Sequence, residues 1–197
     1  MILFLPPAPH TGSFFDTVRK RLDMPSKAAT YPGYGGLPPT APTIAAYAQS
    51  LLPQPLGTRL VGFHTGCLVA LEMAMQDSSF GELILVDIPF FTQVQRAEYS
   101  AGLDPVDPEQ AAFRAAFAYD IDGALAMAAH PITFVATDSS LFEPTRRAAS
   151  IVQGCKLVEA RHIGKPAFEG EAMAELLQEL LGGVPPDNSQ VPAPQSP

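Results

Sequence analysis

Short apolar runs alternate with helix-like segments along most of the 197-residue chain. Each run is short enough to be one buried strand, and the runs lie at residues 2–5, 28–31, 59–62, 82–86, 132–136 and 156–160. The segments between most of them carry apolar residues at a helical spacing. This alternation is typical of a parallel sheet with helices on both faces. The sequence therefore predicts an α/β fold with about six mainly parallel strands.

The alternation is interrupted once, between residues 89 and 131. No good strand lies there, but two alanine-rich helices are expected. The first has Asp107 as its N-cap, Pro108 at the first helical position and Gln110 three residues after the cap, as in a capping box. The second spans about residues 121–130. This segment is expected to form a short helical cap inserted after the fourth strand.

The chain contains 21 prolines, an unusually high number. Most of them stand near the ends of predicted strands, where α/β proteins build their sites. The last ones belong to a polar, proline-rich segment that cannot pack into a core. We therefore expect one domain over residues 1–182, with the cap at about 89–131, and a disordered tail over residues 183–197.

Composition limits the partners and the compartment. The chain has 12 Lys and Arg against 20 Asp and Glu, a net charge of -8. Without a basic stripe, this charge argues against nucleic acid and anionic membranes as partners. No apolar run approaches the roughly 18 residues of a membrane span, and no signal peptide or disulfide framework is evident. We expect a soluble, cytoplasmic protein that binds neither nucleic acid nor membranes.

The segment most informative about chemistry is RLVGFHTGCLVALEMAM, residues 59–75. It reads as a strand, a turn Gly62-Phe63-His64-Thr65-Gly66 and an apolar helix. Small residues on both sides of the central residue are typical of a nucleophile elbow, a strained turn that exposes one side chain above the sheet. The helix that follows offers free N–H groups and the positive end of its dipole to an oxyanion.

With LFLPPA at residues 3–8 and YPGYG at residues 31–35, this segment resembles the α/β-hydrolase superfamily, and most closely its thioesterase branch. The resemblance extends over nearly all of residues 1–182. It implies a three-layer α/β-hydrolase fold, reduced to about six strands because an early strand pair is missing. If the chain is an enzyme, the resemblance implies a carboxylic ester or thioester hydrolase.

Two of the three catalytic positions that the resemblance implies are changed. His64 stands in place of the serine nucleophile, and Lys165 stands in place of the catalytic histidine. Asp138 is the expected acid, and His162 lies three residues before Lys165 in the same loop. Without a hydroxyl group at the turn, the ordinary acyl-enzyme route is closed.

The resemblance also implies an oxyanion site. The backbone N–H of Ala8 would contribute to it, beside the turn flanked by Gly62 and Gly66. Thr65 is expected to point away from the pocket, and His10 is either at the pocket mouth or an exposed loop residue. Cys67 is either a nucleophile or a small buried residue. Asp87 is either an alternative acid or a loop cap.

Three hypotheses remain open. The chain is a non-catalytic or impaired hydrolase homologue that binds a ligand or a partner, or an enzyme in which His64 acts as base or nucleophile with Asp138 and His162. Alternatively, His64 only fills space. Apolar residues of the cap favour a small apolar or acyl ligand, or a homodimer interface: Phe113, Phe117, Leu125 and Met127. No metal or nucleotide cofactor is expected, because the ligand spacings and glycine-rich loops they need are missing.

Overall fold

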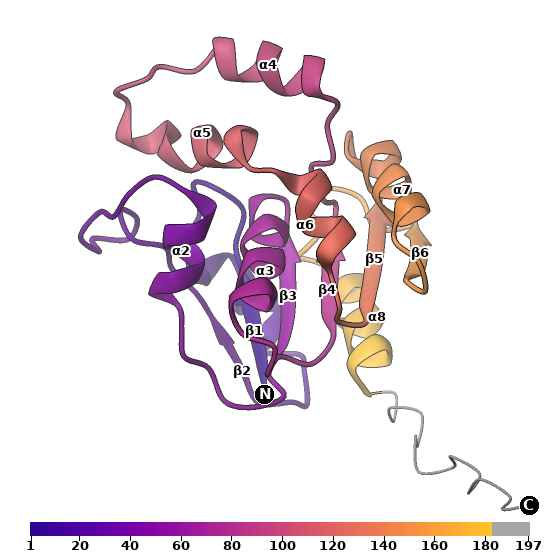
Figure 1. Cartoon of the computed structure of the whole chain (residues 1–197). Helices are drawn as coiled ribbons and strands as arrows, with labels where there is room; N and C mark the ends of the chain where they lie inside the picture. The colour runs from indigo at the N-terminus through magenta and orange to yellow at the C-terminus, as the bar shows by residue number, and fades with distance from the viewer. Residues whose placement is uncertain (183–197) are drawn as a thin grey trace, which may run out of the picture.

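The computed structural model describes residues 1–182. Its sheet has six strands in the order β2-β1-β3-β4-β5-β6, and all neighbouring pairs are parallel (Figure 1). The strands are β1 (Ile2–Leu5), β2 (Ser26–Ala28), β3 (Arg59–Phe63), β4 (Leu83–Val86), β5 (Ile132–Thr137) and β6 (Lys156–Ala160). The predicted six-stranded parallel sheet is confirmed.

Eight α-helices and two short 3-10 helices make up the other regular elements of the described residues. The α-helices are α1 (Asp16–Arg19), α2 (Ile44–Ser50), α3 (Thr65–Gln76), α4 (Gln93–Ala101), α5 (Ala111–Ala118), α6 (Ile121–Met127), α7 (Phe142–Ile151) and α8 (Glu171–Gly182). The 3-10 helices are η1 (Gly12–Phe15) and η2 (Pro108–Gln110).

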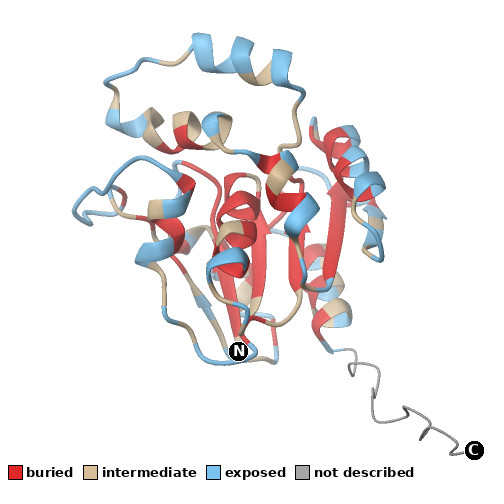
Figure 2. Cartoon of the chain, viewed as in Figure 1, coloured by how far each residue is buried: buried red, intermediate tan, exposed pale blue. Residues whose placement is uncertain are grey.

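Side chains of the central strands divide between two cores. Along β1, Leu3 and Leu5 belong to the core that includes residues of α2, α3, α5 and α6. The alternate residues Ile2 and Phe4 belong to the core that includes residues of α1 and α8. Successive strand residues point to opposite faces of a sheet, so both faces are covered. Figure 2 accordingly shows the central strands as buried.

The second strand differs from its predicted position. The sequence predicts residues 28–31, whereas β2 pairs with β1 through Ser26–Ala28. The register places Ala28 opposite Phe4, and the Ala29 N–H donates to the Phe4 carbonyl (2.8 Å); after Leu5, β1 is followed by Pro6 and Pro7. Proline has no N–H to donate to a ladder, and the pairing ends there. Between β1 and β2 the chain forms η1 followed directly by α1, which ends at Arg19.

The cap contains a helix that the sequence analysis did not predict. Helix α4 has no buried residue and lies over α5, away from the sheet (Figures 1 and 2). Its N-cap Thr92 and Gln95 form a capping box. The capping box predicted at Asp107 is wrong in its second half: Asp107 accepts from the Glu109 N–H, but the Gln110 side chain accepts from Asp104 instead.

Among residues 1–182, no helix is both long and apolar enough to cross a membrane. The tail predicted over residues 183–197 lies outside the described residues.

Candidate functional site

The turn between β3 and α3 has the strand–turn–helix geometry expected from the sequence. His64 has φ 50° and ψ −117°, and a positive φ is uncommon for a residue other than glycine. The His64 N–H donates to the Val86 carbonyl at the end of β4 (3.2 Å), and the Cys67 N–H donates to the His64 carbonyl (2.9 Å). These bonds fix His64 at the carboxyl end of the sheet.

Gly62 and Gly66 are required because α3 packs directly on the sheet. A Cβ atom on Gly62 would lie 2.6 Å from the Gly66 carbonyl oxygen and 2.7 Å from the Cys67 nitrogen. A Cβ atom on Gly66 would overlap the carbonyl oxygen of Leu5 at the end of β1. Any side chain at these positions would push α3 away from β1 and β3, so the spacing of the glycines reflects close backbone approach.

The His64 side chain is half-buried, and its Nε2 atom is buried without a hydrogen-bond partner. Its ring centroid lies 4.0 Å from that of Phe63. Burial lowers the pKa of His64 to about 4; the negative charge of Asp87 opposes this shift, while Lys165 and His10 add to it. The imidazole is therefore neutral near pH 7.

Asp87, directly after β4, is the buried carboxylate near this turn. It is fully buried and has φ 50°. One carboxylate oxygen accepts from the Thr137 N–H (2.8 Å) and the other from the Thr137 hydroxyl (2.5 Å). The carboxylate therefore links the ends of β4 and β5. From the sequence, Asp87 is either an alternative acid or a loop cap, and its place directly after a buried strand is the signal that marks it.

The expected acid and the residues of the last loop lie on the surface. Asp138, His162 and Lys165 are all exposed. The Asp138 N–H donates to the Ile163 carbonyl (2.9 Å), so the end of β5 and the loop after β6 are adjacent. Within residues 1–182, no side-chain hydrogen bond connects these three residues with one another or with His64. The loops meet as expected, but their side chains form no triad.

The other predicted pocket residues divide between the surface and the interior. Ala8 and Thr65 are buried, and His10 is exposed with its ring 5.0 Å from that of Phe14. Cys67 is fully buried, and its Sγ donates to the carbonyls of Gly62 and Val86, both at 3.2 Å. Burial raises the pKa of Cys67 well above that of an ordinary thiol. A thiol in this state is a poor nucleophile.

His64, Asp87 and Lys165 line none of the four most prominent cavities on residues 1–182. One of them, of about 330 Å³, lies where the cap helices α5 and α6 meet α2 and α3. Within the described residues, no group of three or more His, Cys, Asp or Glu side chains is placed to hold a metal ion.

No family model and no curated protein matches the sequence. Solved structures do match. An esterase from Exiguobacterium antarcticum is 17% identical and superposes with a TM-score of 0.72, covering 92% of this chain and 91% of that chain. The enol-lactonase from Burkholderia xenovorans LB400 is 14% identical, with a TM-score of 0.72 and coverage of 92% and 91%.

An esterase from Mycobacterium tuberculosis is 18% identical, with a TM-score of 0.66 and coverage of 92% of this chain and 84% of that chain. Identities this low show the fold alone. The fold that the chain shares with these proteins is the α/β-hydrolase fold, here with six parallel strands.

Proposed function

We propose that this protein is a non-catalytic α/β-hydrolase homologue that binds a small apolar ligand at its cap. The observation that carries the proposal is the side chain at the turn before α3. His64 offers no hydroxyl group, and its Nε2 atom is buried without a partner. Hydrolysis through an acyl-enzyme needs a nucleophile that is hydrogen-bonded to a base, which a third group orients.

Neighbouring residues do not replace the missing nucleophile and base. The buried Cys67 thiol has a raised pKa and donates to backbone carbonyls, and Thr65 is buried at the start of α3. Lys165 stands where the family has a histidine, and a lysine ammonium group has three donors and no acceptor, so it does not replace the imidazole as a base. These features support loss of the hydrolytic reaction.

The ligand class follows from the cap. The sides of α5 and α6 that line the cavity of about 330 Å³ carry Ala115, Ala118 and Ala124. The wall of this cavity is therefore made mainly of small, apolar side chains. Concave apolar cavities of this size commonly hold small molecules. An apolar ligand would be bound there and released unchanged, at a distance from the turn that carries His64.

One observation favours a second candidate, in which His64 acts as a base on water. Its pKa of about 4 keeps the imidazole neutral and able to accept a proton at neutral pH. However, both oxygens of the nearby Asp87 carboxylate accept hydrogen bonds from Thr137, and Asp138 and His162 are exposed. No carboxylate of this set orients the His64 ring by a hydrogen bond, which an efficient base would need.

Ester hydrolysis distinguishes the two candidates. The purified chain and its His64→Ala variant would be incubated with short-chain p-nitrophenyl esters and acyl-CoA thioesters. We expect equal, background rates for both proteins. Turnover by the wild type that disappears in His64→Ala would contradict the proposal and favour the second candidate. A His64→Ser, Lys165→His double variant then tests the rest of the site, because a gain of activity would mean that only those two positions prevent catalysis.

A further inference from the structure

The cavity at the cap is lined by residues of four helices. It lies between α2, α3, α5 and α6, which share one face of the sheet (Figure 1). Its volume of about 330 Å³ falls at the lower end of the range for small-molecule sites. The apolar part of the wall includes Ile44, Met75, Ala115, Ala118, Ala124 and Met127. Small side chains leave this space open, and the two flexible methionines at its rim can adapt to an occupant.

One charged group of α3, Glu72, lines this cavity. Its Oε2 accepts a hydrogen bond from the Tyr119 hydroxyl (3.0 Å), and its Oε1 accepts one from the Gln76 amide (2.8 Å). An ionised carboxylate has about four acceptor positions, so two remain. Both partners are neutral, and they orient the carboxylate without compensating its charge.

Tyr119 strengthens this arrangement. Burial, and after it the negative charge of Glu72, raise the pKa of the Tyr119 phenol. The phenol therefore stays protonated and remains a donor to Glu72 at all ordinary pH values. It also ties the end of α5 to α3, so the carboxylate is held in a fixed place on the cavity wall.

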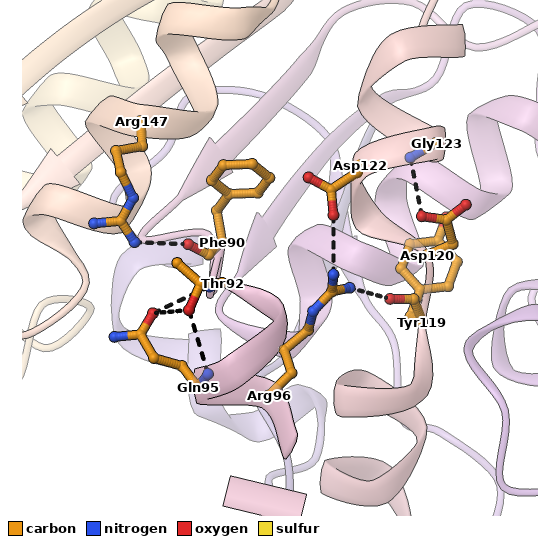
Figure 3. A network of polar contacts seen from close by, with 9 residues as sticks. All are labelled: Phe90, Thr92, Gln95, Arg96, Tyr119, Asp120, Asp122, Gly123 and Arg147. Carbon is orange, nitrogen blue, oxygen red and sulfur yellow. Dashed lines mark hydrogen bonds and ion pairs between the residues drawn. The ribbon is translucent and has the colours of Figure 1, made fainter. Parts of the chain in front are cut away.

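The cavity wall carries negative charge and no positive charge. Asp120 also lines it, and one of its oxygens accepts from the Gly123 N–H (3.1 Å). No Lys, Arg or His among the described residues lines this cavity. Arg96 lies across the junction of α5 and α6. Its guanidinium donates hydrogen bonds to the Asp122 carboxylate (2.9 Å) and to the Tyr119 carbonyl (3.0 Å), as Figure 3 shows. The charge of Glu72 is left for an occupant.

We infer that this cavity binds a compact organic amine, with its ammonium group at Glu72 and its hydrocarbon body among the alanines of α5 and α6. The inference deepens the proposed function and rests on it, since it assigns the site and the class of the ligand. Charge complementarity selects a cation, because an ammonium group supplies donors to the two free acceptor positions of Glu72. The volume selects a ligand of about one ring.

Calorimetric titration of the full chain tests the inference with three probes of one shape. Benzylamine is cationic, benzyl alcohol is neutral, and benzoate is anionic. We expect benzylamine to bind about tenfold or more tightly than benzyl alcohol, since hydrogen bonds to charged groups are stronger than neutral ones. Benzoate should not bind.

Variants locate the site. Glu72→Gln should weaken benzylamine binding about tenfold and leave benzyl alcohol binding unchanged. Ala118 is exposed and lines the cavity, so Ala118→Phe should fill it and abolish binding of both probes without affecting the fold. Glu175→Gln removes an exposed carboxylate from α8, on the opposite face of the sheet, and should bind as the wild type does.

Several results would overturn the inference. They are a failure of benzylamine to bind, equal binding of the three probes, or binding that Glu72→Gln does not weaken. A dimer in analytical ultracentrifugation that Ala118→Phe dissociates would also overturn it, because a second copy would then cover the cavity. Probe binding without preference for the amine would leave the proposed function standing, whereas ester turnover that depends on His64 would contradict the proposed function and not the amine site.

Discussion

The histidine at the turn before α3 should make the stability of this protein depend on pH. Its pKa is about 4 in the folded chain against an ordinary value of 6.5. Between these values the unfolded chain binds a proton that the folded chain does not. The free energy of unfolding therefore falls as the pH falls through this window, by about 2 kcal/mol at pH 4.5.

Urea denaturation at pH 7 and pH 4.5 measures this effect. In His64→Ser, the loss of stability on acidification should be about 2 kcal/mol smaller than in the wild type. His162→Ser is the matched control, because His162 is exposed, and it should retain the pH dependence of the wild type. An equal pH dependence in all three proteins would show that His64 is not buried as described.

Among single residues, the sequence allowed the turn to be predicted, but not the acid beside it. Gly62, His64 and Gly66 lie as their spacing indicates, because the pattern is local and each glycine meets a nearby backbone. Asp87 and Asp138 both follow buried strands, so the sequence alone does not separate them. The two carboxylates differ because Asp87 accepts hydrogen bonds from Thr137, which lies 50 positions later in the chain. These hydrogen bonds exist only once β4 and β5 are neighbours in the sheet.

At the scale of elements, helix α4 is attached to the rest of the cap through few side chains, Arg96 and Tyr99 among them; the Tyr99 ring centroid lies 5.6 Å from that of Phe117. None of its residues is buried, and Arg96 connects it to α6 through Asp122 and to the Tyr119 carbonyl (Figure 3). Arg96→Met should therefore change the global stability by about 1 kcal/mol or less. Amide hydrogen exchange within residues 93–101 should become faster, because these amides exchange through local opening.

Arg146→Met provides the comparison for this variant. Arg146 pairs with Glu143 and with Glu159 of β6, and neither partner belongs to the cap. The Arg146→Met variant should leave amide hydrogen exchange in α4 unchanged. Faster exchange throughout the chain in Arg96→Met would contradict the expectation, since Arg96 would then support the whole fold and not the attachment of α4.

The same helix shows which elements could be predicted from the sequence. Strands β3, β4 and β5 and helices α3 and α8 have strong apolar patterns because they build the two cores. Helix α4 buries no residue and is mostly polar, so it lacks the apolar runs of the core elements, and the Thr92 and Gln95 capping box marks its start. The position of β2 was missed for a different reason, because its pairing ends where Pro6 and Pro7 follow the neighbouring strand β1.

At the scale of the whole molecule, the two faces of the sheet are covered differently. On one face, α8 packs with α1 and with aromatic residues near the turn, and no cavity of the four opens between them. On the other face, the cap helices meet α2 and α3 around the open cavity. We therefore expect the free energy of folding to depend more on the first face and ligand binding to depend on the second.

Two substitutions of phenylalanine by alanine compare these parts of the molecule. Phe168 is 1% exposed and packs on Phe63 and Phe15, with ring centroids 4.8 and 4.9 Å away. Phe168→Ala should cost about 3–5 kcal/mol, a large share of the roughly 5–15 kcal/mol that stabilises a domain. Phe91 is only half-buried and contacts Tyr99 of α4, so Phe91→Ala should cost about 1 kcal/mol. Urea denaturation measures both values, and a comparable loss in the two variants would mean that the cap and the sheet form one equally packed core.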